Sequence, residues 1–200
     1  NQLVDGLWTY SIESIWSGLQ DCYADLRSNV KKLYDGIEIE SLAAIGVSAM
    51  MHGYMPFNEK EEILVPFRTW RNTNTGRAAA ELSELFVYNI PLRWSISHLY
   101  QAILNNETHV KDIKFLTTLA GYVHWQITGE KVLGIGDASG MLPIDPATNN
   151  YSAEMVEKFD NLIAPKEYNW KLEDILPKVL SAGENAGVLT PEGSRKLDVS

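Results

Sequence analysis

The segment LAAIGVSAMMHG, residues 42–53, decides the fold class. Its first half, Leu42 to Val47, is a short apolar run without polar alternation, which is typical of a strand buried on both faces of a parallel sheet. His52 follows at the carboxyl end of that strand, where ligands bind in open α/β sheets. The segment therefore predicts an α/β domain with a candidate ligand site at His52. The structural alternative is a histidine that caps the turn at Gly53.

Helical periodicity dominates the sequence on both sides of this strand. Apolar residues at steps of three and four predict a long helix that is capped by Ser11 and ends near Gly36. One strand, a hairpin and several helices indicate an α/β or α+β architecture. The further elements that we expect are a hairpin of residues 54–57 and 63–67 with a charged tip, helices over residues 78–86, 95–104 and 110–127, a glycine-rich loop over 134–140, and a helix over 152–163.

Composition excludes several classes of function. The chain has 200 residues and a net charge of −9, whereas a nucleic-acid partner or an anionic membrane surface requires a basic face. Six Trp, nine Tyr and five Phe are incompatible with a disordered chain. No apolar run approaches the ~20 residues that span a bilayer, and Asn1–Tyr10 does not have the pattern of a signal peptide. The single cysteine, Cys22, fits a reducing compartment, most simply the cytoplasm.

Metal and phosphate motifs are weak in this sequence. His98, His109 and His124 do not have metal-ligand spacing, and no cysteine or close carboxylate completes a set, so we expect no metal site. The segment Gly134–Gly140 is rich in glycine, but it follows a helix and leads into a proline instead of opening a helix. A plain loop is therefore the favoured interpretation of this segment.

The polar turn Trp70–Thr75 is the densest group of hydrogen-bonding side chains. A sugar needs an aromatic face for its C–H bonds and planar polar groups for its hydroxyl pairs, and this turn offers both. A solvated turn before the next helix is the structural alternative. Arg93 could reach an anion or a hydroxyl pair, whereas the neighbouring Trp94 is equally compatible with a core position at a helix start.

Five strings in the same order resemble the FGGY family of carbohydrate kinases, and in particular its xylulokinase-like members. Together they cover nearly the whole chain. They are Trp8-x-Tyr10-Ser11-x-Glu13 before the first helix, Gly46-Val-Ser-Ala-Met-Met51-His52-Gly53, Pro66-Phe-Arg-Thr-Trp70-Arg-Asn72-Thr-Asn74-Thr75, Tyr122-Val-His-Trp-Gln-Ile-Thr128-Gly129, and Asp137-Ala-Ser-Gly140-Met-Leu142-Pro-Ile-Asp145.

The resemblance implies an actin-like, ribonuclease-H-like fold and ATP-dependent phosphorylation of a sugar hydroxyl with Mg²⁺ in a cleft between two domains. Residues 1–200 would be most of the amino-terminal, sugar-binding domain, without the family's first strands and second domain. The catalytic base would lie after Ser200, so we expect no catalytic residue and no activity in this chain alone. A ketopentose such as xylulose or ribulose is the favoured substrate, with no nucleic acid or membrane as a partner and with a homodimer allowed.

The residues carried over from the family's sugar contacts are Met51 and His52, followed by Trp70 and Asn72, while Asp137 is expected to cap a loop. With the residues singled out above, the candidate substrate-binding set is Met51, His52, Trp70, Asn72, Asn74, Arg93 and Trp94. The sequence departs from the family where Trp-x-Asp-x-Arg becomes Trp70-x-Asn72-x-Asn74, and His98 stands where members often carry a lysine. These departures keep a second hypothesis open, a non-catalytic actin-like module that binds a sugar or acts as a scaffold.

Overall fold

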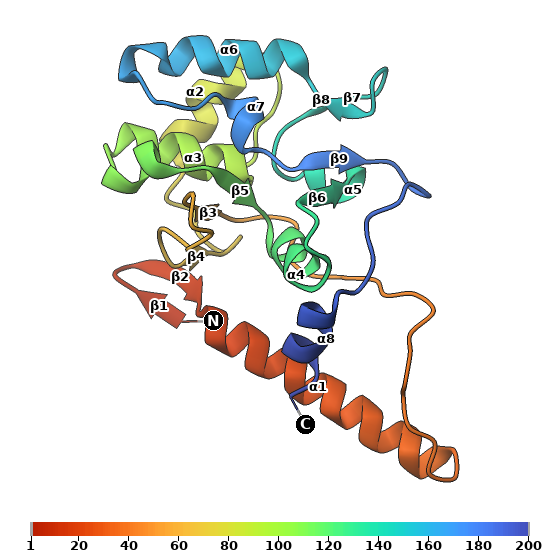
Figure 1. Ribbon diagram of the computed structural model, residues 1–200. Helices are drawn as coiled ribbons and strands as arrows, with labels where there is room; N and C mark the ends of the chain where they lie inside the picture. The colour runs from red at the N-terminus through yellow and green to blue at the C-terminus, as the bar shows by residue number, and fades with distance from the viewer. Residues whose placement is uncertain (1, 200) are drawn as a thin grey trace.

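A long amphipathic helix, α1, runs along the lower side of the molecule, and the other helices and short strands lie above it (Figure 1). This arrangement comes from a computed structural model, which describes residues 2–199. The helices are α1 (Ile12–Leu33), α2 (Gly76–Phe86), α3 (Ser95–Leu104), α4 (Leu119–Thr128), α5 (Ile135–Ala138), α6 (Ala153–Ile163), α7 (Leu172–Ile175) and α8 (Pro191–Leu197), with 3₁₀ turns at Thr108–Asp112 and Ala164–Lys166.

The strands form four small sheets within the described part of the chain. Among the strand pairs of residues 2–199, β6 with β9 is parallel and the others are antiparallel. The sheets are β1 (Gln2–Val4), β2 (Leu7–Tyr10) and β4 (Phe67–Arg68); β3 (Met55–Phe57) with β5 (Phe115–Thr117); β6 (Val132–Gly134) with β9 (Lys178–Leu180); and β7 (Ile144–Asp145) with β8 (Asn150–Tyr151).

Two hydrophobic clusters hold these elements together. The larger one packs α2, α3, α6 and α7 around fully buried side chains such as Leu82, Leu99 and Phe159. The smaller one joins α1 to β3, β5 and α4 and is rich in aromatic rings. Phe57 stacks on the ring of Tyr122 at 5.6 Å, and Trp16 of α1 donates a hydrogen bond to the Tyr122 hydroxyl. Aromatic burial thus fixes α1 to the body of the domain.

Most of the predicted helices are confirmed. Ser11 and Ser152 cap α1 and α6 with their side chains, as the sequence predicts. Gly129 ends α4 with a φ of 80°, the left-handed conformation that glycine adopts without strain. No helix among residues 2–199 is long and apolar enough to cross a membrane.

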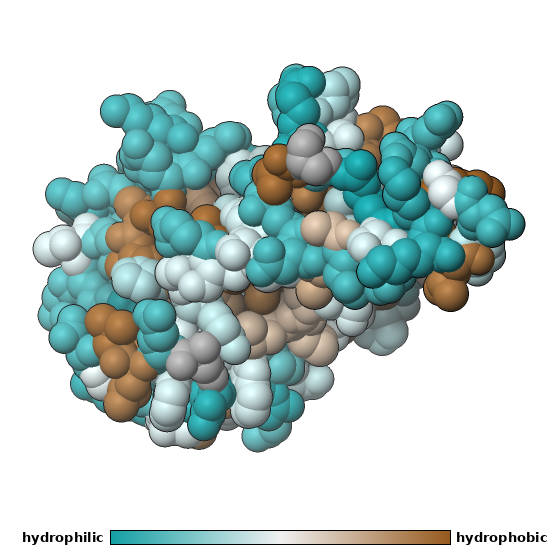
Figure 2. Space-filling view, turned by 90° about the horizontal axis from the view of Figure 1, so that it is seen from below, coloured by the Kyte–Doolittle hydropathy of each residue, from teal (hydrophilic) through white to brown (hydrophobic). Residues whose placement is uncertain are grey.

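The predicted buried strand Leu42–Val47 is wrong. This segment has no regular secondary structure, and its side chains are exposed except for the half-buried Val47. No strand within residues 2–199 pairs with it; instead it lies along α1 and α4 and forms one wall of an apolar groove of about 420 Å³. A strand needs a hydrogen-bonding neighbour, and an apolar run without one stays an extended loop. Seen from below, hydrophobic patches interrupt the hydrophilic surface of this side (Figure 2).

Two further expectations need correction. The long helix predicted over residues 110–127 is divided into a 3₁₀ turn, the strand β5 and the shorter α4, because residues 115–117 pair with β3. The predicted hairpin is reduced to isolated bridges, Tyr54 with Arg68 and Phe57 with Ile63, while its strands pair with other elements. Residues 134–140 are not a plain loop, since they contain the short helix α5.

Candidate functional site

The segment Met51–Gly53 is held in place by the start of α3. The backbone N–H of Gly53 donates to the carbonyl of Arg93 at 3.2 Å, and the buried Ser95 hydroxyl donates to the Gly53 carbonyl at 2.7 Å. Gly53 has a φ of 118°, and a side chain there would collide with the Arg68 carbonyl and the Phe67 ring. Glycine is therefore required at this turn, which holds the backbone of the half-buried Met51 and His52 close to the backbone of Arg93.

His52 has a defined tautomer. Its Nδ1 lies 3.3 Å from the carbonyl oxygen of Gly140, and because a carbonyl only accepts, Nδ1 must carry the proton. Burial lowers the pKa of His52, the bond to Gly140 opposes this shift, and the nearby positive charge of Arg93 adds to it. The neutral imidazole is thus favoured, and its Nε2, which makes no hydrogen bond within residues 2–199, is left as an acceptor for a hydroxyl group.

The polar turn Trp70–Thr75 has buried side chains that hold the fold together and exposed side chains that face solvent. Asn72 is 3 % exposed, and its amide is fully used: it accepts from the Trp8 N–H and donates to the carbonyls of Trp8 and Thr69. Thr75 donates to the Leu92 carbonyl at 2.6 Å and so ties the turn to the segment before α3. Trp70 is 52 % exposed and Asn74 is exposed, so these two side chains remain available to a ligand.

Arg93 and Trp94 also differ in how far their side chains are exposed. The Arg93 side chain is exposed, and the carbonyl of Arg93, which accepts from the Gly53 N–H, places this residue next to the turn that carries His52. Trp94 is half-buried, packs against the larger hydrophobic cluster and has its ring centroid 6.4 Å from that of Tyr88. Trp94 therefore supports the start of α3 and remains partly exposed.

The structure thus brings Met51, His52 and Arg93 together. Within residues 2–199, no hydrogen bond or ring contact joins Trp70 or Asn74 to them. The sequence did not identify Gly140, although a side chain there would lie 2.6 Å from His52 Nδ1. The glycine-rich composition of residues 134–140 was the available signal, because backbone that closely approaches another group needs glycine.

A hollow of about 360 Å³ lies at the carboxyl ends of β6 and β9, and none of Met51, His52 and Arg93 lines it. Its lining includes Asp137 and His124; Asp137 is half-buried, and burial raises the pKa of its carboxyl. Asp137 accepts from the Gly140 N–H through its backbone carbonyl, so α5 connects the hollow to the carbonyl that holds His52.

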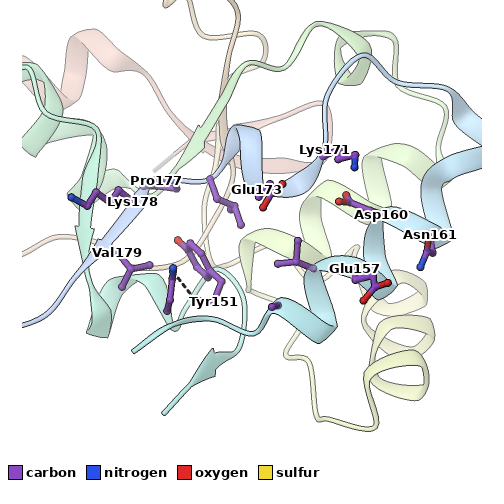
Figure 3. A pocket seen from close by; sticks show the side chains of 13 residues that line it. Tyr151, Glu157, Asp160, Asn161, Lys171, Glu173, Pro177, Lys178 and Val179 are labelled. Atoms are coloured by element: carbon purple, nitrogen blue, oxygen red, sulfur yellow. Dashed lines mark hydrogen bonds between the residues drawn. The ribbon is translucent and has the colours of Figure 1, made fainter. Parts of the chain in front are cut away.

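Another hollow, of about 660 Å³, lies elsewhere, between α6, α7, β8 and β9 (Figure 3). Its acidic side chains include Glu157, Glu173 and Asp160, and Asp160 accepts a hydrogen bond from the Leu172 N–H. Residues of the candidate site do not line it. Among residues 2–199 there is no group of three or more His, Cys, Asp or Glu that could hold a metal ion.

Comparison with known proteins places this geometry in a family. Residues 5–199 match the model of the amino-terminal domain of the FGGY family of carbohydrate kinases. The chain is 25 % identical over 159 residues to the xylulose kinase of Haemophilus influenzae, and this match covers 74 % of the chain and 31 % of that protein.

Solved structures share the fold. A xyloylose kinase from Brucella ovis superposes with a TM-score of 0.78 at 20 % identity, covering 96 % of this chain and 38 % of that one. A gluconate kinase from Lactobacillus acidophilus superposes with a TM-score of 0.74 at 16 % identity, covering 98 % and 38 %.

These matches define the architecture as that of an actin-like, ribonuclease-H-like sugar-kinase domain. The chain belongs to the FGGY family of carbohydrate kinases. It spans about a third of the length of the curated relatives that it matches.

Proposed function

We propose that residues 1–200 are most of the amino-terminal, sugar-binding domain of a two-domain kinase that transfers a phosphoryl group from ATP to a sugar hydroxyl. The match to the family model over residues 5–199 supports the reaction class. The observation that carries the site is the neutral His52 with a free Nε2 next to the exposed Arg93. A ketopentose such as xylulose or ribulose is the proposed substrate, supported by the xylulose kinase relatives.

In this proposal each side chain has a separate task. A sugar hydroxyl donates to His52 Nε2, and the planar guanidinium of Arg93 donates to an adjacent pair of hydroxyl oxygens. Trp70 offers a ring face to the sugar C–H bonds. In this proposal, residues outside 2–199 bind most of the ATP and the Mg²⁺, and one of them is the base that accepts the hydroxyl proton. We therefore expect that this chain alone releases no ADP. The exposed thiol of Cys22 supports a reducing compartment, which we propose is the cytoplasm.

The test is ADP release by the complete protein with Mg-ATP and a panel of ketoses, aldoses and polyols. One hydrogen bond is worth about 0.5–1.5 kcal/mol, so His52→Ala is expected to raise the KM for the sugar about two- to tenfold with little change in the KM for ATP. His124→Ala is the matched control, because His124 is also half-buried and also contacts a backbone carbonyl, that of Ala186. An unchanged sugar KM in His52→Ala would reject the site.

The non-catalytic module remains the second candidate, because amides stand at Asn72 and Asn74 where the family has an acid and a base. It predicts no sugar-dependent ADP release from a complete protein that circular dichroism and a cooperative melting transition show to be folded. Sugar binding in that protein, measured by calorimetry, would then identify a sensor, and its absence would identify a scaffold.

A further inference from the structure

A circuit of buried and partly buried polar groups lies between the segments that form the proposed sugar site. It consists of Tyr54, Arg68, Glu107 and His109. Both segments of the site are adjacent to the circuit in sequence: residues 51–53 directly precede Tyr54, and the turn of residues 69–74 directly follows Arg68. None of the four circuit residues belongs to the proposed ligand contacts.

The circuit begins in the backbone. Tyr54 and Arg68 exchange both backbone hydrogen bonds, at 2.9 and 3.2 Å, and so form an antiparallel bridge. The carbonyl of Arg68 also restricts Gly53, since a side chain on Gly53 would lie 2.5 Å from that oxygen. The spacing between the two segments is therefore set where Tyr54 meets Arg68.

Side chains complete the circuit. The guanidinium of Arg68, which is 8 % exposed, donates from both terminal nitrogens to the two carboxylate oxygens of Glu107, one of them at 3.2 Å. Nδ1 of His109 lies 3.6 Å from the Glu107 carboxylate, and its Nε2 is 2.9 Å from the Tyr54 hydroxyl. Arg68 also lies over the Tyr54 ring, 5.4 Å from its centroid. The path thus returns to Tyr54, whose side chain and backbone are both tied to Arg68.

The charges of the circuit are compatible with burial. Burial would raise the pKa of Glu107, but the hydrogen bond and the charge of Arg68 overcome this effect and lower it. A bidentate Arg–carboxylate pair has a more restricted geometry than any contact a lysine could make. Burying an ion pair adds little to the stability of a fold, since well-packed apolar side chains often stabilise it as much or more. The fixed geometry of the Arg68–Glu107 pair therefore explains its presence better than stability does.

The segment before α3, which carries Arg93 and Trp94, is tied to the same circuit through α3. Ser95, at the start of α3, donates to the Gly53 carbonyl, and the His98 ring stacks on Tyr54 with centroids 6.3 Å apart and planes at 22°. Glu107 follows the end of α3, and its backbone N–H donates to the carbonyl of Ala102. The circuit therefore touches every element that presents a candidate sugar contact.

We propose that Arg68 and Glu107 are positioning residues of the sugar site: their partly buried ion pair holds Arg68 in the backbone bridge to Tyr54 that sets the separation of residues 51–53 and 69–74, and thereby the affinity for the sugar. This inference rests on the proposed function. It predicts a specific effect on the sugar, because binding depends on placing His52 and Trp70 in one arrangement.

The experiment uses the complete protein with the double variant Arg68→Met/Glu107→Gln, which removes both charges together and leaves no buried charge unpaired. We expect a cooperative melting transition close to that of the wild type, a KM for the favoured sugar at least fivefold higher, and a KM for ATP within twofold. The matched control is Arg77→Met/Glu81→Gln, an exposed ion pair on α2, which should change neither KM. A folded double variant with an unchanged sugar KM, or with both KM values raised equally, would overturn the proposal.

Two further measurements keep the inference testable. If the double variant does not fold, Tyr54→Phe is the second variant, because it removes only the hydroxyl that contacts His109. It should still raise the sugar KM but leave the KM for ATP unchanged. An unaltered sugar KM would reject the circuit.

If the wild type shows no sugar-dependent ADP release, the proposed function fails, and hydrogen exchange then tests positioning directly. The amides of Gly53, Thr69 and Asn72 should exchange faster in the folded circuit variant than in the control, and equal exchange would overturn the inference.

Discussion

His98 should make the stability of this chain depend on pH. It is 1 % exposed in α3, its Nε2 has no hydrogen-bond partner among residues 2–199, and burial, helped by the charge of Arg68, lowers its pKa from 6.5 to about 3. Between pH 3 and 6.5 the unfolded chain therefore binds a proton at His98 that the folded chain does not bind. Stability is fully present above pH 6.5 and falls as the pH decreases through this window.

The magnitude follows from the two pKa values. At pH 5.0 the unfolded-state imidazole is protonated and the folded one is neutral, and 1.5 pH units at about 1.36 kcal/mol each give a loss of about 2 kcal/mol relative to neutral pH. His98→Phe keeps a ring against Tyr54 but cannot be protonated. We expect its free energy of unfolding at pH 7.5 to equal or exceed that of the wild type, because an unpartnered buried nitrogen is removed.

The assay is urea denaturation followed by tryptophan fluorescence at pH 7.5 and pH 5.0. Burial also lowers the pKa of His52 and of His109, so the wild type loses stability from several histidines, and the comparison with the variant isolates the share of His98. The variant should lose about 2 kcal/mol less than the wild type between the two pH values. Equal losses would refute the reasoning, because they would mean that His98 can be protonated without unfolding.

Two substitutions test the contacts that hold the candidate site. Gly140→Ala places a methyl group 2.6 Å from His52 Nδ1 and should cost about 1–3 kcal/mol in urea denaturation, whereas Gly136→Ala has open space and should stay within about 0.5 kcal/mol; equal effects would contradict the close packing. Ser95→Ala leaves the buried Gly53 carbonyl without its hydroxyl donor and should also cost about 1–3 kcal/mol, and an unchanged midpoint would show that water replaces the hydroxyl.

The sequence predicted helices better than strands, and the reason lies in the range of the interactions. The ends of α1 and α6 follow from neighbouring residues, since Ser11 and Ser152 cap them locally. The strand β5 has no such local signal, because residues 115–117 become a strand only through pairing with β3, about sixty residues earlier. The apolar run Leu42–Val47 shows the converse error: its composition suits a strand, but composition does not supply a partner.

The candidate site was predictable only in part. The string around Met51–Gly53 and the charge of Arg93 pointed to residues that the structure brings together. The alignment of motifs could not reveal that Gly140 holds His52, because that contact joins residues 88 positions apart through a backbone carbonyl. Nor could it reveal the ion pair of Arg68 and Glu107, since neither residue belongs to the candidate sugar contacts.

The hydrogen bonds of Asn72 bear on whether the replacement of the family's acidic residue by this amide is a sign of lost activity. Its amide group accepts one hydrogen bond from the Trp8 N–H and donates two, to the carbonyls of Trp8 and Thr69. A carboxylate could accept the first bond but would face two carbonyl oxygens with no proton to offer, in a position that is 3 % exposed. The hairpin of β1 and β2 thus requires an amide at this position. The replacement of an acid by Asn72 is explained by local structure, and it does not by itself favour a non-catalytic module over a kinase.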